Sequence, residues 1–151
     1  SRVFLDLKFH DIPNTVRKAV RAAHHWGVQL VDVHVSGGPE MMKAAAEAVR
    51  ESEPGGRPLV FGVTVLTHLG DDDLRSLGLA TTSRQQVVRL ARLARECGLD
   101  GVVASAHEVA AVQEATESQL EVMVPGVRPQ WASAAHDQKR QTRQGNAPAE
   151  R

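Results

Sequence analysis

Short runs of branched apolar residues alternate with longer helical segments along most of the chain, and this alternation limits the possible folds. The apolar runs span residues 2–7, 29–35, 58–66, 101–105 and 119–124. Between them, apolar residues recur at intervals of three and four, the period of a helix with one buried face. Strands separated by helices at this spacing form right-handed βαβ units, whose strands are parallel. The sequence therefore predicts an α/β fold with about five parallel strands in sequential order.

The helical segments have clear start and stop signals. Pro39 suits the first turn of a helix, and Gly27 suits the position just after one. Ser83, followed by Gln86, is the expected N-cap of a third helix, and the acidic run 71–73 favours the start of another. The expected helices span residues 14–26, 39–52, 83–97 and 107–115.

The alternation stops near Pro129. Residues 130–151 are polar and have no apolar period, so we expect a loop and tail after a domain of residues 1–129. Five strands are too few to close an eight-stranded barrel. Because the first residue is Ser rather than Met, we expect the natural start to lie upstream.

Charge and cysteine content restrict the partners and the compartment. The 18 basic residues balance 18 acidic residues, which gives no electrostatic reason to expect binding to nucleic acid or to an anionic membrane. No apolar run approaches the roughly 20 residues that span a bilayer, and the first residues lack the pattern of a signal peptide. A single cysteine, Cys97, excludes an internal disulfide and fits a reducing compartment. We therefore expect a cytoplasmic protein.

A cluster of charges at the end of the first strand carries the chemistry. Asp6 and Lys8 are two residues apart, so both side chains point to one face of the strand, whereas Leu5 and Leu7 are expected to pack on the other. Asp11 follows in the loop. Opposite charges on an inner strand face are costly in a closed core but common at the rim where α/β barrels build active sites. The alternative is a structural salt bridge at a loop entry.

Other candidate features have simpler explanations. The turn Ser36–Gly38 could bind an anion through its N–H groups, but a tight turn explains its glycines. The adjacent His24 and His25 lack ligand spacing, so we expect no metal site. His10 is expected to serve the loop, and His34 to be a core histidine with its polar atoms satisfied.

The string FLDLKFHDIPNT, residues 4–15, resembles the D-x-K-x-x-D-I signature of the orotidine 5′-phosphate decarboxylase family. Further segments resemble the same family in the same order, and the match covers about residues 2–140. These segments are VDVHVSGGPEMM, VTVLT, GLDGVVASAHE, VPGVRP and Asp137–Gln138.

The resemblance implies the central portion of a (β/α)₈ barrel that works as a homodimer. It implies conversion of orotidine 5′-monophosphate (OMP) to UMP and CO₂, the last step of de novo pyrimidine synthesis, without metal or cofactor. Lys8 matches the proton donor, and Asp6 matches the carboxylate beside the substrate's carboxyl group. Asp11, Ile12 and Thr15 also match the family pattern, in which Asp11 and Thr15 serve the partner subunit's site. Thr67 matches a hydroxyl near the pyrimidine. Arg128 and Gln138 match residues on the nucleotide and phosphate side.

The chain also departs from the family pattern. The family's first-strand Asp and second-strand Lys would precede Ser1, and its phosphate-binding Gly-Arg pair would follow the last residue. We therefore expect this chain alone to be nearly inactive. Two alternatives stay open: a related decarboxylase acting on a sugar phosphate, and a non-catalytic barrel remnant or interaction module.

Overall fold

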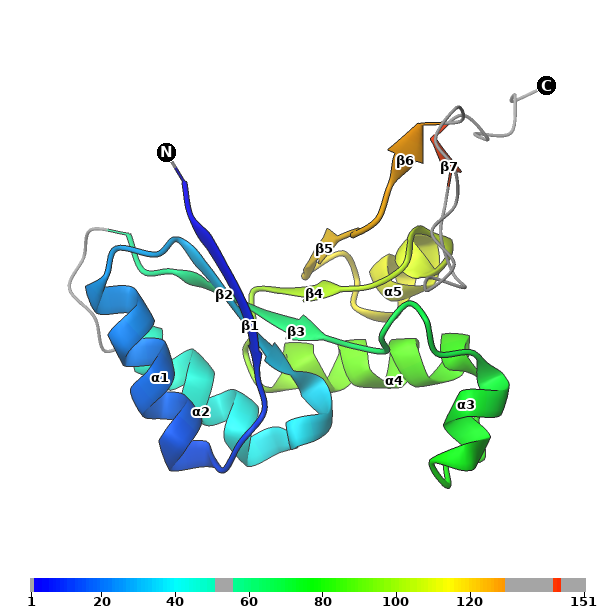
Figure 1. Cartoon of the computed structure of the whole chain (residues 1–151), viewed down its shortest axis with the longest axis horizontal. Helices are drawn as coiled ribbons and strands as arrows, with labels where there is room; N and C mark the ends of the chain where they lie inside the picture. Colours follow the sequence, from blue (N-terminus) through cyan, green and yellow to red (C-terminus); the bar gives the residue numbers. More distant parts are fainter. Residues whose placement is uncertain (1, 51–55, 130–142, 145–151) are drawn as a thin grey trace.

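The computed structural model describes residues 2–50, 56–129 and 143–144. Its centre is a parallel sheet in which the strands follow the order β1-β2-β3-β4-β5 (Figure 1). Every neighbouring pair in this sheet is parallel, as the alternation predicts. The prediction of five parallel strands in sequential order is therefore confirmed. The strands are β1 (Phe4–Phe9), β2 (Leu30–His34), β3 (Leu59–Val63), β4 (Gly101–Val103) and β5 (Glu121–Met123).

The helices follow the strands as the apolar periods predict. They are α1 (Pro13–His25), α2 (Pro39–Arg50), α3 (Asp71–Ser76), α4 (Ser83–Glu96) and α5 (Val109–Ala115), with 3₁₀ turns at Val35–Gly37 and Ala106–Glu108. Gly27 has a φ of 73°, which allows the chain to leave α1 and turn toward β2. The three aspartates of 71–73 form the first turn of α3, where they favour the positive end of the helix dipole.

The start of α4 differs by one residue from the prediction. Its N-cap is Thr82, whose side chain accepts a hydrogen bond from the Gln85 amide at 3.2 Å. The Gln85 side chain accepts one in return from the Thr82 amide, also at 3.2 Å. Ser83 is instead the first helical residue and donates its amide to Asp71 at 2.7 Å. The expected cap at Ser83 with Gln86 is thus wrong, because Thr82 forms the same capping box one position earlier.

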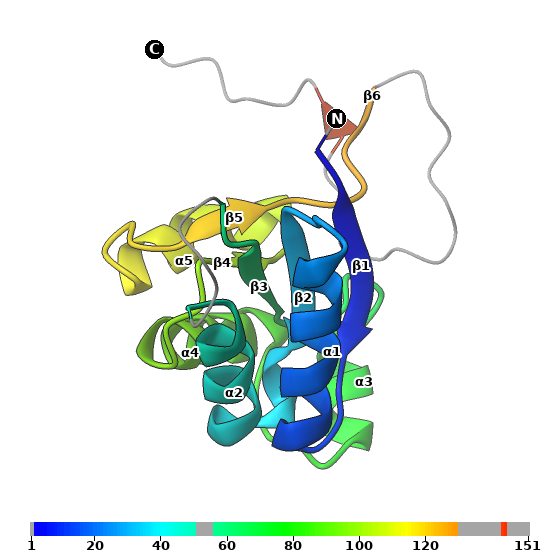
Figure 2. The same cartoon turned by 90° about the vertical axis from the view of Figure 1, so that its left-hand side faces the viewer.

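Small side chains hold the helices against the sheet. The largest fully buried residues are Met41, Met42 and ten valines, among them Val16 and Val20 on α1. The buried faces of α1 and α2 also carry alanines such as Ala23 and Ala45, which allow close packing. The two helices lie side by side (Figure 2), and α2 also contacts β3. Among the described residues, no helix is long and apolar enough to cross a membrane.

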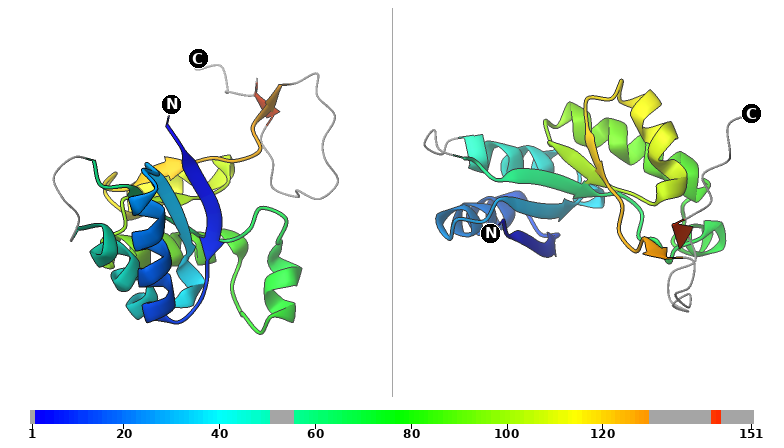
Figure 3. Two further views of the ribbon diagram at one scale, coloured as in Figure 1. Left: turned by 60° about the vertical axis from the view of Figure 1, so that its left-hand side comes forward. Right: turned by 90° about the horizontal axis from the view of Figure 1, so that it is seen from above.

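Two elements lie away from this packed layer. The short helix α3 stands beyond the N-terminal end of α4, and a second, two-stranded sheet extends away from β5 (Figure 3). This sheet pairs β6 (Arg128–Pro129) with β7 (Arg143–Gln144) in parallel. Part of the segment expected to be a polar tail therefore pairs with the end of the preceding domain, while 130–142 and 145–151 lie outside the described residues.

We predict that Gly101→Ala lowers the free energy of unfolding by about 1–3 kcal/mol, the usual effect of overpacking. A Cβ atom at this position would lie 2.5 Å from Cζ of Phe61 and 2.7 Å from the carbonyl oxygen of Glu121 in β5. Gly70→Ala is the matched control, because its Cβ would meet only Oδ2 of Asp73 at 3.7 Å, and a change within about 0.5 kcal/mol is expected. Urea unfolding measures both, and equal effects would contradict this view of the sheet.

Candidate functional site

A pocket of about 730 Å³ opens on the face of the sheet opposite to the helices, and all five strands contribute to it. The strands contribute Phe4, Asp6, Lys8, Asp32, Val63, Val103 and Met123, and the loops that follow them add Val65, Leu66, Thr67, His68, Ala104 and Pro125. Most of these residues lie at or just after the carboxyl ends of their strands. In parallel α/β folds this is the edge where ligands bind.

An ion pair forms the charged part of the pocket wall. The Lys8 ammonium donates a hydrogen bond to Oδ1 of Asp6, and both side chains remain partly exposed. This bond is the main reason why the pKa of Asp6 lies below its usual value. The structure thus brings together Asp6, Lys8 and Thr67, three of the residues that the motifs single out. A fixed ammonium and carboxylate at an open cavity can act on a substrate by charge and by proton transfer.

A bulge in β1 gives Lys8 its conformation. Leu5 pairs with Val31 and Phe9 with Val33, so four steps along β1 match two along β2. Within this bulge Lys8 has a φ of 48°, in the left-handed region that residues with a Cβ rarely adopt. Leu7 is turned out and is 56% exposed, so its expected packing is wrong, whereas Leu5 and Phe9 pack against the core. The bulge breaks the simple alternation on which that expectation rested.

Asp32 is a site residue that the sequence analysis did not single out. It lies in β2, is only 1% exposed, and accepts the backbone N–H of Lys8 through Oδ1 at 2.7 Å. Burial, opposed by this hydrogen bond and reinforced by the nearby Asp6, raises the pKa of Asp32 to about 6. Its other oxygen, Oδ2, has no hydrogen-bond partner among the described residues. A proton on Asp32 would remove its repulsion with the nearby Asp6 carboxylate.

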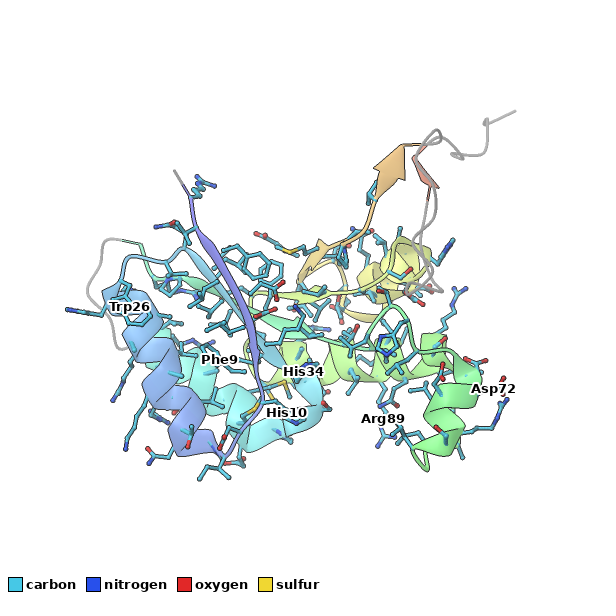
Figure 4. The ribbon with its side chains drawn as sticks, viewed as in Figure 1. Phe9, His10, Trp26, His34, Asp72 and Arg89 are labelled. Atoms are coloured by element: carbon cyan, nitrogen blue, oxygen red, sulfur yellow. The ribbon has the colours of Figure 1, made fainter. Side chains whose placement is uncertain are left out.

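Two histidines lie beside this cluster. The rings of His10 and His34 are tilted by 38° with centroids 5.2 Å apart, next to the end of β1 (Figure 4). His34 is half-buried, and burial, followed by the charges of His10 and Lys8, lowers its pKa. The expectation of a core histidine is therefore replaced by a pair at the rim. The chain forms a 3₁₀ turn at Val35–Gly37, and Gly38 follows with a φ of 89°, which supports the tight-turn interpretation of 36–38.

The other predicted site residues do not line the pocket. Asp11 and Ile12 are exposed between β1 and α1, and Thr15 is exposed in the first turn of α1. Oδ1 of Asp11 accepts the Ile12 amide at 2.6 Å. The backbone of Arg128 lies in β6, but its side chain lies outside the described part, as does the whole of Gln138. In the described ranges, no group of three or more His, Cys, Asp or Glu side chains is placed to hold a metal ion.

We predict that Asp32→Asn changes how stability depends on pH. The carboxyl has a pKa of about 6 in the folded chain, against an ordinary value of 3.8. Between these values the unfolded chain has lost the proton that the folded chain still holds, so the wild type loses stability as pH rises through this window. Relative to the Asn variant the loss should reach about 1–3 kcal/mol. Urea unfolding of both proteins at about pH 4.5 and pH 7.5 measures it, and a constant difference would contradict the assignment.

Comparison with known proteins places this site in a family. The sequence model of the "Orotidine 5′-phosphate decarboxylase / HUMPS family" matches residues 1–150. The orotidine 5′-phosphate decarboxylase of Saccharophagus degradans is 51% identical over 130 residues, covering 86% of this chain and 54% of the relative. That of Vibrio atlanticus is 52% identical over 140 residues, covering 91% and 59%. The chain thus spans little more than half the length of these curated relatives.

Solved structures with the same fold also resemble this chain. The crystal structure of orotidine 5′-phosphate decarboxylase from Lactobacillus acidophilus superposes with a TM-score of 0.78 at 37% identity, covering 84% of this chain and 58% of that one. A crystal structure of an uncharacterized conserved protein from Geobacillus kaustophilus gives 0.76 at 42% identity, covering 80% and 58%. With a family match along nearly its whole length, the chain belongs to the orotidine 5′-phosphate decarboxylase / HUMPS family.

Proposed function

We propose that this chain carries the catalytic groups of an OMP decarboxylase, which converts OMP to UMP and CO₂. The observation that carries the proposal is the Lys8–Asp6 ion pair, set in a pocket at the carboxyl ends of five parallel strands. Relatives named for this activity are about half identical to the chain, which favours a nucleotide over a sugar phosphate as substrate.

The proposed reaction needs a cation and a proton at one ring carbon. When the bond to the carboxylate breaks, CO₂ leaves and its electron pair stays on the pyrimidine carbon. The Lys8 ammonium stabilises this developing charge and then donates its proton to form the new C–H bond. Asp6 holds the ammonium through their hydrogen bond and directs it into the pocket. Solvent returns a proton to Lys8, since its side chain remains partly exposed.

Other proposed roles follow the motif positions. Thr67, on the pocket wall, offers a hydroxyl to the pyrimidine ring. Arg128 and Gln138 are proposed to bind the nucleotide and its phosphate. No metal or cofactor takes part in this proposal, because the lysine supplies both the charge and the proton.

We also propose that two copies of the chain act as a homodimer in the cytoplasm. Asp11, Ile12 and Thr15 are exposed and do not line their own pocket. Ile12 is 67% exposed and is therefore accessible to a partner surface. In the proposed dimer, this loop contacts the partner's pocket, where Asp11 adds a second carboxylate near the partner's lysine.

We predict that Lys8→Ala lowers kcat by at least about 10³-fold, since it removes the proton donor and the stabilising charge together. The loss of OMP absorbance measures turnover by this chain and by a form extended to the length of its relatives. Lys18→Ala is the control, because Lys18 is exposed on α1 and away from the pocket. Full activity of Lys8→Ala in a protein that turns over OMP would refute the role of Lys8.

A mixing experiment tests the shared site. Lys8→Ala and Asp11→Ala homodimers should both be impaired. A mixed dimer should contain one pocket with both defects and one with neither, so about a quarter of wild-type activity is expected after equal mixing and exchange if pairing is random. Light scattering establishes the oligomeric state. A monomer, or a mixture no more active than its components, would contradict the proposed dimer.

A further inference from the structure

The bulge in β1 leaves a backbone donor that the neighbouring strand does not satisfy in the ordinary way. Leu5 is the last residue before the bulge that pairs with β2, opposite Val31, and Phe9 is the first after it, opposite Val33. The residues between them face a single residue of β2, Asp32. A buried backbone N–H without an acceptor is costly, so a bulge of this size needs an acceptor from elsewhere.

The side chain of Asp32 supplies that acceptor. Its Oδ1 lies 2.7 Å from the Lys8 nitrogen, in a position where the carboxyl group is 1% exposed. The contact therefore takes the place of the missing ladder bond. The contact also holds the backbone of Lys8, whose φ of 48° lies outside the range of a strand. Such a conformation persists only where the surroundings hold it.

We infer that Asp32 is a positioning residue, which holds the backbone of Lys8 in the bulge so that its ammonium meets Asp6 at the pocket. Asp32 lines the same pocket, but its bonded oxygen acts on the main chain of Lys8 rather than on the ammonium. The inference deepens the proposed function, and its catalytic consequence rests on Lys8 being the proton donor. The hydrogen bond itself can be tested without turnover.

Amide hydrogen exchange of Lys8, followed by NMR on the whole chain, is the first test. Asp32→Ala should speed exchange at Lys8 about tenfold, the factor expected when one net hydrogen bond is lost. Asp32→Asn keeps an oxygen acceptor and should restore protection to within about threefold of wild type. Thr64→Val is the matched control: Thr64 is a buried polar residue just after β3 that donates to the Val103 carbonyl at 2.7 Å, and its loss should leave Lys8 unchanged.

A pH titration provides a second readout that survives if Asp32→Ala does not fold. The charged groups facing Asp32 are Asp6 and Lys8 of β1, and His10 and His34 lie further along the rim. In the wild type, the Lys8 amide shift should follow protonation of Asp32 near pH 6. In Asp32→Asn that component should vanish, leaving only what the histidines contribute. A wild-type titration identical to that of Asp32→Asn would overturn the inference, as would full protection of Lys8 in Asp32→Ala.

Turnover separates this inference from the proposed function. In the active form, Asp32→Ala should lower kcat at least tenfold with little change in KM, and Asp32→Asn should recover most of it. If Lys8→Ala abolishes turnover but Asp32→Ala leaves kcat intact, the positioning role is overturned and the proposed function stands. If Lys8→Ala leaves turnover intact, the proposed function fails, while the exchange data still decide whether Asp32 holds the Lys8 amide.

Discussion

The division of the parallel sheet into two faces is the constraint on which the rest of the structure depends. Successive residues of β2 point to opposite faces, so Val31 and Val33 are fully buried on the helix side while Asp32 lies between them on the pocket side. The helix face is lined mainly by apolar side chains, because helices α1, α2, α4 and α5 cover it. The pocket face holds charged groups, because it is open beside Asp6 and Lys8 and these two side chains form an ion pair. Chemistry is thus confined to one face by the geometry of a strand.

The charged cluster is a compromise between burial and attraction. Two carboxyl groups and one ammonium cannot all be neutralised by direct pairing. Asp6 takes the ammonium of Lys8, and the pKa of Asp6 falls. Asp32 receives only the backbone amide, and burial raises its pKa to about 6. The two acids are therefore pushed apart in proton affinity, the usual result when like groups share a site. Asp6 keeps its charge through the mildly acidic range, whereas Asp32 takes up a proton as the pH falls to about 6.

Much of the fold could be predicted from sequence because its signals are local and repeated. Apolar periods identify the helices, and the D-x-K pattern places Asp6 and Lys8 on one face. The bulge was not predictable in this way, because it depends on how β1 pairs with β2, and it explains why Leu7 is exposed rather than packed. Thr82 was missed as a cap because Thr82 with Gln85 and Ser83 with Gln86 both fit the capping-box pattern. Asp32 was missed because one acid within a run of valines does not disturb the pattern of a strand, although its cost when buried makes it the informative residue.

The same energetic argument connects Asp32 with the proposed substrate. OMP would bring a further carboxylate toward Asp6 and Lys8, and each added negative charge makes ionisation of a buried neighbour harder. Asp32, whose pKa of about 6 lies nearer to neutral pH than that of Asp6, is the acid whose protonation responds more readily to such a charge. If substrate binding shifts Asp32 toward its neutral form, binding takes up a proton, and the site limits repulsion without moving a side chain. Departure of CO₂ removes the added charge and reverses the shift, so the pocket would return to its starting state as UMP forms. Proton uptake on binding an inert 6-carboxylate analogue of OMP, measured by calorimetry in two buffers, should therefore be smaller in Asp32→Asn than in the wild type.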